Sequence, residues 1–241
     1  GPSPDAPSTS SSPATTTARQ QSRYLAEDVH DFAFAAWDQF HSIDETTPEG
    51  VKIRCLFPPG HEAVARTEIS TVKFGLGYFG AAFGRYPYKT LTIVHPPSEA
   101  IEAGGMEYPT LITTGGSWMH DPLGGRELEI VTLHELAHQW FYGMVGTNEH
   151  RWPFLDEGLT SYAEGDACEA AWPDASAGEL WGLRVGLPAI YRIGALQSKR
   201  NTRVSQSAAG FVSGQDYASL VYSRTETALR TLGNVYGKDT V

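Results

Sequence analysis

The stretch His134-Glu135-Leu136-Ala137-His138 decides which fold and which chemistry we expect of this chain of 241 residues. It lies inside a strongly helical pattern, in which residues four positions apart project from the same face of the helix. Both imidazoles can therefore reach one metal ion. Zinc accepts neutral imidazole nitrogen well, and a catalytic zinc takes three protein ligands and leaves a fourth position for water or substrate. The two histidines leave one protein ligand to be found.

Glu157 is the third ligand in this interpretation. Eighteen residues separate it from His138, and it stands in the segment Trp152-Pro153-Phe154-Leu155-Asp156-Glu157-Gly158, where the pattern of a new helix begins. A loop and a helical turn of that length can return a carboxylate to the first helix. Two histidines and one glutamate leave a bound zinc ion a strong Lewis acid. We therefore predict one Zn²⁺ per chain, held by His134, His138 and Glu157.

Glu135 neighbours a ligand in sequence but points about 100° around the helix from it. We therefore expect it to flank the metal and to act as the general base, taking a proton from a water molecule whose pKa zinc lowers to about 7. The alternative is a surface helix with chance histidines, because the short pattern is common. Apolar residues in the same segment favour a packed helix instead, in which a histidine pair needs a partner. These residues are Val131, Leu133, Leu136 and Ala137.

The rest of the chain divides into a tail, a strand-rich part and a helix-rich part. Residues 1–22 are rich in Pro, Ser and Thr, and we predict a flexible tail because they cannot offset the entropy of ordering. Strand patterns lie at 51–57, 91–95 and 108–114. Helical patterns lie at about 62–83, 127–145, 155–171, 177–196 and 217–236. This order predicts an α+β fold, in which a small mixed sheet packs against a mainly helical half.

The composition excludes several classes of protein. A formal net charge of -10 argues against sequence-independent nucleic-acid binding, which needs Lys and Arg to neutralise phosphates. No apolar run approaches the roughly 20 residues of a membrane-spanning helix, so we expect a soluble protein without a membrane span. The compartment, cytoplasmic or exported, and the oligomeric state stay open. Cys55 and Cys168 favour two isolated core residues over a single bridge between them.

Two further motifs accompany the metal pattern. Gly104-Gly105-Met106-Glu107-Tyr108 lies upstream of it, and Val221-Tyr222 lies downstream. Together with HExxH, the spacing of eighteen residues and Glu157, these motifs resemble the M1 family of gluzincin aminopeptidases. The resemblance runs from about Tyr24 to the C-terminus. It implies a thermolysin-like gluzincin catalytic domain with the zinc ligands and the general base named above.

The resemblance also implies a site for the free α-amino group of the substrate. Gly105, Met106 and Glu107 match the substrate-binding GxMEN motif of the family, in which the Glu binds that amine. A carboxylate beside the active site can form a charge-assisted hydrogen bond with an ammonium group, which registers the cut one residue from the N-terminus. The sequence departs from the motif at Tyr108, where the family most often has Asn, and Pro109 follows. This departure bears on the aminopeptidase activity more than on the zinc site.

Two more roles follow from the resemblance. Tyr222 matches the family tyrosine that donates a hydrogen bond to the tetrahedral oxyanion, a contact worth a few kcal/mol in the barrier. Tyr217 is not the residue that matches, and without the resemblance either tyrosine suggests core packing. Glu164, seven residues beyond Glu157 on the same helical face, resembles the acid that orients a zinc-bound histidine.

The family pattern also suggests how the chain is divided and what it does. Residues 23–50 resemble the exit segment or linker from an absent N-terminal β domain, and residues 51–241 resemble a zinc peptidase domain that is truncated at its C-terminus. We expect zinc-dependent hydrolysis of peptides that have a free N-terminus. An endopeptidase or amidase that does not register the amine is the alternative. A non-catalytic binding scaffold fits less well, because all three ligands and the base are present.

Overall fold

The structure is a computed structural model of the chain, and it describes residues 21, 23–115, 124–198 and 203–240. The tail that the composition predicts for residues 1–22 lies outside the described residues, apart from residue 21. Most of the described strands precede the helix-rich part, and the fold is of the α+β type that the sequence predicts.

The main sheet has four strands in the order β1-β2-β3-β4. They are β1 (His41–Thr46), β2 (Lys52–Phe57), β3 (Thr90–Val94) and β4 (Leu111–Thr113). β1 pairs antiparallel with β2, whereas β2, β3 and β4 run parallel, so the sheet is mixed as predicted. The strand predicted at 108–114 is confirmed only over β4, because a turn occupies its first part. The sequence pattern does not predict β1, whose side chains are largely exposed and which lies inside the segment 23–50.

Helix α1 (Glu62–Phe83) has the predicted bounds and packs against β2. Its buried residues recur at spacings of four and three, as expected for one face of a helix. The stripe comprises Ala65, Ile69, Val72, Leu76 and Phe79. It forms one core cluster with the strands of the sheet and with the helix that carries the HExxH motif.

Helix α2 (Glu127–Ala137) carries that motif, and the prediction that it extends to residue 145 is wrong. Beyond it, the amides of Gln139 and Trp140 bond to carbonyls three residues back, and Tyr142 takes a φ of 90°. Trp140 leaves the helix because it fills the core. Its ring lies 5.5 Å from that of Phe79, and its Nε1 donates to the Gly84 carbonyl. Tertiary packing therefore overrides the apolar periodicity.

Helix α3 (Glu157–Ala171) confirms most of the helix predicted at 155–171, and the short 3₁₀ segment η3 (Pro153–Leu155) precedes it. The helix predicted at 177–196 is wrong over its first half. Strands β5 (Gly178–Leu180) and β6 (Leu183–Val185) form an antiparallel hairpin there, and helix α4 (Leu187–Ala195) follows. Trp181 and Gly182 have φ values of 51° and 82°, which suit the two-residue turn of a hairpin.

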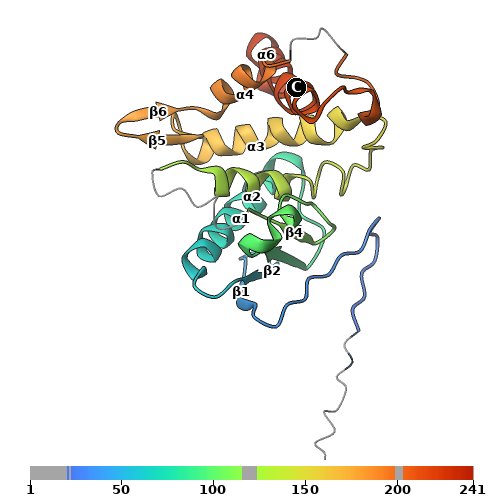
Figure 1. Ribbon diagram of the computed structural model, residues 1–241, viewed down its shortest axis with the longest axis vertical. Coiled ribbons are helices and arrows are strands. Elements are labelled where there is room, and N and C mark those ends of the chain that lie inside the picture. Colours follow the sequence, from blue (N-terminus) through green and yellow to red (C-terminus); the bar gives the residue numbers. More distant parts are fainter. Residues whose placement is uncertain (1–20, 22, 116–123, 199–202, 241) are drawn as a thin grey trace, which may run out of the picture.

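The helix predicted at 217–236 is confirmed in extent but not in type. Helix α5 (Gly214–Tyr217), the π-helical segment η5 (Ala218–Arg224) and helix α6 (Thr225–Tyr236) follow one another without a break. The remaining short 3₁₀ segments are η1 (Ser98–Ala103), η4 (Ala208–Gly210) and η6 (Lys238–Thr240). Figure 1 shows α3 between the half that contains the sheet, α1 and α2 and the half that contains α4 and α6, with the β5–β6 hairpin projecting at one end.

The two cysteines lie in the hydrophobic core. Cys55 on β2 and Cys168 on α3 are both fully buried and free, which confirms two isolated core residues rather than a bridge. In the part of the chain that the structure describes, no helix combines the length and the apolar character needed to cross a membrane.

Candidate metal centre and active site

The two histidines of the HExxH motif converge on one carboxylate oxygen. The Nε2 atoms of His134 and His138 lie 3.0 Å and 3.2 Å from Oε2 of Glu157, the first residue of α3. The three ligand atoms lie within 4.8 Å of one another. Two imidazole nitrogens and a carboxylate oxygen form a donor set that zinc and related ions accept. The structure therefore brings the three expected ligands together, and these residues fit a metal ion.

A buried carboxylate bonds to the other ring nitrogen of His134. Nδ1 of His134 lies 2.7 Å from Oε2 of Glu164, which is 1% exposed. The Tyr191 hydroxyl on α4 donates to Glu164 over 2.9 Å. Such a partner fixes the imidazole tautomer and leaves Nε2 free for a metal. Sequence reasoning misses Tyr191, although it lies in the confirmed part of the helix predicted at 177–196, because the contact is a tertiary one.

His138 has its own pair of supporting residues, which sequence reasoning also misses. Its Nδ1 lies 2.8 Å from Oδ1 of Asp156 and 3.1 Å from the hydroxyl oxygen of Thr160. Both partners are almost fully buried. Asp156 precedes the expected ligand Glu157, and Thr160 lies three residues beyond Glu157 on α3. Their closeness to a ligand in sequence is a signal that could have found them.

The charges at this centre compete for protons. Burial alone would lower the pKa of His134, but its hydrogen bonds to Glu157 and Glu164 outweigh burial and raise that pKa to about 10. Burial also opposes the charge on His138, yet the Asp156 and Glu157 carboxylates raise its pKa well above the usual value. Burial would raise the pKa of Glu157, but its bonds to the histidines lower it. Without a metal, protonated imidazoles balance the carboxylates, and a cation can take over that role.

Glu135 is buried beside the expected ligands. Its side chain is 4% exposed, and its Oε2 has no hydrogen-bond partner among the described residues. Burial is the main cause that raises the pKa of Glu135 to about 8, although His134 and His138 lower it. A buried acceptor without a protein partner suits a donor from outside the chain, such as a water molecule. The structure therefore places the Glu135 carboxylate beside the expected ligands, where the expected base would stand.

Tyr222 reaches the centre from the π-helical segment η5. Its ring stacks on the His134 imidazole, with centroids 5.7 Å apart and planes inclined by 22°. Burial and the Glu157 carboxylate raise the pKa of Tyr222, so its hydroxyl stays protonated and can donate a hydrogen bond. Tyr217 lies edge-on against the Tyr222 ring, with centroids 6.0 Å apart, and has no ring contact with either histidine.

A glycine lets the π-helical segment approach the metal site. A Cβ atom on Gly158 would lie 2.5 Å from Cγ2 of Thr225 and 2.9 Å from the Val221 carbonyl oxygen. Any larger residue would push η5 and the first residue of α6 away from the start of α3, where Glu157 stands. π-helical turns often occur at functional sites because they shift the side chains that follow. The sequence gives no sign of this turn.

The segment 104–107 lies along the outer edge of β4. The amides of Gly105 and Met106 donate to the Thr113 carbonyl over 2.9 Å and 3.3 Å, and the Thr113 amide donates to Met106 over 2.8 Å. Gly105 has a φ of 71°, and its Cβ position would lie 3.7 Å from Oε1 of Glu135, so the edge passes directly beside the base. Met106 is partly exposed on this edge.

Glu107 follows on the same edge and enters the candidate site. Carboxylate oxygens of Glu107 and Glu135 and a ring nitrogen of His138 lie within 4.8 Å of one another. Burial raises the pKa of Glu107, while His138 lowers it and Glu157 raises it further. A carboxylate that is destabilised in this way gains from a positively charged partner.

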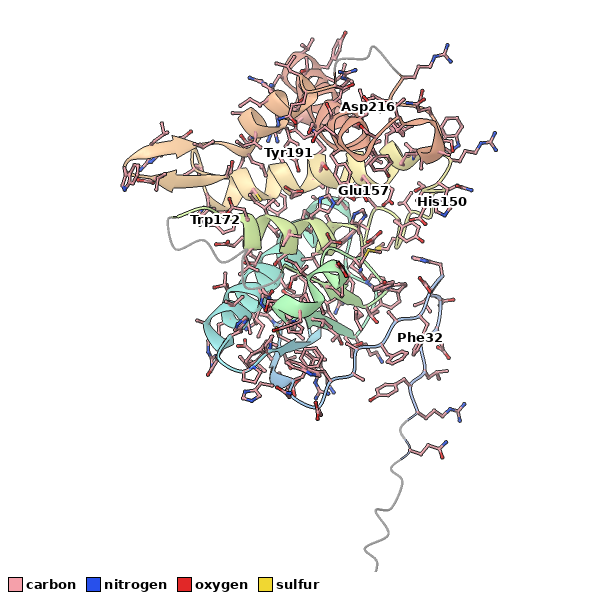
Figure 2. All side chains as sticks on the ribbon, viewed as in Figure 1. Phe32, His150, Glu157, Trp172, Tyr191 and Asp216 are labelled. Atoms are coloured by element: carbon pink, nitrogen blue, oxygen red, sulfur yellow. The ribbon has the colours of Figure 1, made fainter. Side chains whose placement is uncertain are left out.

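One cavity of about 710 Å³ is lined by the three expected ligands together with Gly105, Glu107, Glu135, Glu164, Tyr191 and Tyr222. Met106 lines a different cavity. The apolar wall of the cavity at the expected ligands consists of Ile130, Val131, Leu180, Val185, Leu187 and Ile190. No Lys or Arg is among the described residues that line the cavity, whereas several carboxylates are. The negative potential suits a metal cation and an ammonium group. Figure 2 shows Glu157 in the middle of the molecule, where α3 passes between the two halves, and Trp172 toward the hairpin.

Known proteins with similar sequences are aminopeptidases by name. The chain is 28% identical over 197 residues to Aminopeptidase 2 of Candida albicans, a match that covers 78% of this chain and 21% of that protein. It is 27% identical over 220 residues to Aminopeptidase N of Canis lupus familiaris, covering 83% and 21%. It is 31% identical over 144 residues to Aminopeptidase M1-B of Oryza sativa subsp. japonica, covering 56% and 16%. The chain spans about a fifth of the length of these curated relatives.

A family model supports the same relationship. The model described as the peptidase family M1 domain matches residues 67–241. That range includes the edge segment 104–107, both histidines, Glu157 and Tyr222. Because the match covers most of the chain and all of the site, the chain belongs to peptidase family M1.

Proposed function

We propose that this chain forms the zinc-dependent catalytic unit of an aminopeptidase, which removes N-terminal residues from peptides. We also propose that its architecture is the thermolysin-like gluzincin fold. The small mixed sheet, the HExxH motif on α2 and the glutamate at the start of α3 support that fold. The names of the relatives support the activity.

One observation carries the proposal beyond metal binding. The Glu107 carboxylate lies within 4.8 Å of both the base Glu135 and the ligand His138. A peptide whose N-terminal ammonium contacts Glu107 would then present its first carbonyl group to the metal and the base. A longer peptide could not extend in this direction without burying Glu107 against an uncharged chain, which costs free energy.

The residues of the chain divide the chemistry among themselves. A zinc ion held by His134, His138 and Glu157 would polarise the scissile carbonyl and acidify water. Glu135 takes the proton of the attacking water and passes it to the leaving amine, since its raised pKa places it near neutrality. Tyr222 donates a hydrogen bond to the oxygen that gains negative charge.

Glu107 holds the substrate in register. Burial makes its charge costly in the free protein, and an ammonium partner would offset that cost through a charge-assisted hydrogen bond. Met106 and Gly105 present the edge backbone next to it. A substrate with an acetylated amine has no positive charge to offer, so it should bind less well.

The test is a panel of aminoacyl amides, each with a free and with an N-acetylated amine, after the zinc content of the chain has been measured. We expect kcat/KM for the free amines to exceed that for the acetylated amides by about a hundredfold or more, which corresponds to about 2.8 kcal/mol. The variant Glu107→Gln should lose most of this preference. Glu102→Gln, an exposed residue of η1 five positions earlier, is the matched control.

Each outcome has a definite meaning. Equal cleavage of free and acetylated substrates would assign the chain to the endopeptidases or amidases and would remove the role of Glu107. Failure of the zinc-loaded chain to cleave either substrate would contradict a catalytic unit that works alone.

A further inference from the structure

Gln139, the residue after the ligand His138, is 1% exposed and points away from α2 toward the segment that carries Glu107. Its Oε1 accepts from the Thr110 amide over 3.0 Å. Its Nε2 donates to the carbonyls of Glu107 and Tyr108 over 3.3 Å and 3.2 Å. One carboxamide thus binds three backbone groups within four consecutive residues. Only an amide side chain combines one acceptor with two donors in this way.

The backbone that Gln139 holds needs support. The Leu111 amide donates to the Tyr108 carbonyl over 3.0 Å, which closes a β-turn with Pro109 in its second position. The third position is Thr110, with a φ of 60°. Turns of this kind favour Gly or Asn there, and a β-branched residue with positive φ is strained. Without its bond to Gln139, the Thr110 amide would be free to leave this conformation.

Glu107 therefore lies between two anchors. On one side, Met106 pairs with Thr113 at the edge of the sheet. On the other side, Gln139 fixes the carbonyl of Glu107 itself. Because Gln139 is bonded directly to His138, it ties the segment to the end of the helix that carries the metal ligands.

We propose that Gln139 is a positioning residue for the N-terminal ammonium of the substrate. It sets the distance between the Glu107 carboxylate and the metal ligand His138, and thereby the register of the cut. This inference rests on the proposed function, in which Glu107 binds the amine. A displacement of about 1 Å at such a site can cost about a hundredfold in rate.

Gln139→Met tests this role, because Met has a similar length and volume and forms none of the three hydrogen bonds. We expect zinc content to stay the same, amide hydrogen exchange in residues 104–111 to become faster, and KM for free-amine substrates to rise about tenfold or more, with a smaller change in kcat. The low rate on acetylated amides should not change. Thr132→Val is the matched control, since Thr132 is a fully buried polar residue of α2 whose hydroxyl bonds to Leu128 inside the helix.

The outcomes separate this inference from the proposed function. If the unsubstituted chain prefers free amines and Gln139→Met keeps both that preference and the original KM, Gln139 does not position Glu107. Unchanged exchange in residues 104–111 would overturn the inference without any activity measurement. If the unsubstituted chain shows no preference for free amines, the proposed function fails first and the inference fails with it.

Discussion

The ring of Tyr222 lies nearly parallel to the imidazole of His134, with centroids 5.7 Å apart and planes inclined by 22°. The stack aligns a phenol from the π-helical segment η5 with a residue that we expect to bind the metal. The hydroxyl of Tyr222 therefore has a fixed direction relative to the metal site. A donor that is held in place before the reaction stabilises developing charge without reorganisation.

Tyr222→Phe should lower kcat about 10²-fold to 10³-fold, because the substitution removes the donor and keeps the ring that stacks on His134. Zinc content and KM should change little. Tyr217→Phe is the control, since that ring contacts Tyr222 edge-on. Steady-state kinetics of both variants with one free-amine substrate would decide which tyrosine donates to the oxyanion. A larger loss in Tyr217→Phe would mean that Tyr217, and not Tyr222, makes the oxyanion contact.

Glu135→Gln should retain zinc and lower the rate by about 10²-fold to 10⁴-fold, because the amide cannot accept a proton from water. The measurement is kcat together with the zinc content of the same sample. Glu62→Gln on α1 is a suitable control, since Glu62 is exposed and, within the described part of the chain, its side chain bonds to Arg66. Near-normal turnover in Glu135→Gln would mean that another group acts as the base.

Much of the candidate metal site can be predicted from the sequence because it depends on local geometry. On any regular helix, the four-residue spacing places His134 and His138 on the same face. Glu157 and Glu164 are seven residues apart on α3, so placing one of them near α2 also places the other. The helices that carry these residues show in the periodicity of the sequence, whereas the role of Glu164 follows from the family resemblance.

Residues that reach the site through tertiary contacts cannot be predicted in the same way. Tyr191 arrives from α4, which follows a hairpin that the helical pattern conceals. Gln139 reaches the backbone of residues 107–110 only because α2 ends at Ala137 and the chain then turns. The packing of Trp140 in the core requires this turn. No periodicity in the sequence indicates the hairpin before α4 or the end of α2. The small exposed strand β1 is missing from the prediction for a related reason, since it has little burial to detect.

Tyr191→Phe should weaken zinc binding about tenfold, because Glu164 would lose the donor that fixes its carboxylate against His134. Glu164→Gln should weaken it further, up to about a hundredfold. Competition with a chelator of known affinity measures both constants. Tyr236→Phe, a largely exposed tyrosine of α6, serves as the control. Equal zinc affinity in all four proteins would show that His134 needs no orienting partner.

The hydrogen bonds of Glu68 predict an effect on stability away from the candidate metal site. Glu68 is fully buried on α1 and accepts hydrogen bonds from His95, Thr114 and Cys55. Glu68→Gln places an NH₂ group among these donors, and we expect the free energy of unfolding to fall by about 1–3 kcal/mol. Urea denaturation of the zinc-loaded chain measures it. Glu62→Gln, the same substitution on the exposed side of α1, should change stability by less than about 0.5 kcal/mol.

Zinc affinity should rise steeply with pH. In the metal-free chain the pKa values of His134 and His138 are raised above their usual range, so both imidazoles hold protons at pH 7 that a metal ion must displace. Glu157 is already ionised and releases none, because its pKa is lowered. Binding should then release about two protons, and the apparent affinity should increase about a hundredfold per pH unit between pH 6 and 8.

Chelator competition at several pH values gives this slope, and calorimetry in buffers with different heats of ionisation counts the protons directly. Glu135→Gln is the necessary control, because the raised pKa of Glu135, about 8, could add a further proton to the count. The interactions that raise the imidazole pKa values also stabilise the metal-free fold. This stabilisation is complete below the unfolded pKa of about 6.5, and it is lost as the pH rises through the folded pKa values. The metal-free chain should therefore become less stable on the alkaline side, where it binds zinc best. A zinc affinity that did not change with pH would mean that the histidines are neutral before the metal binds.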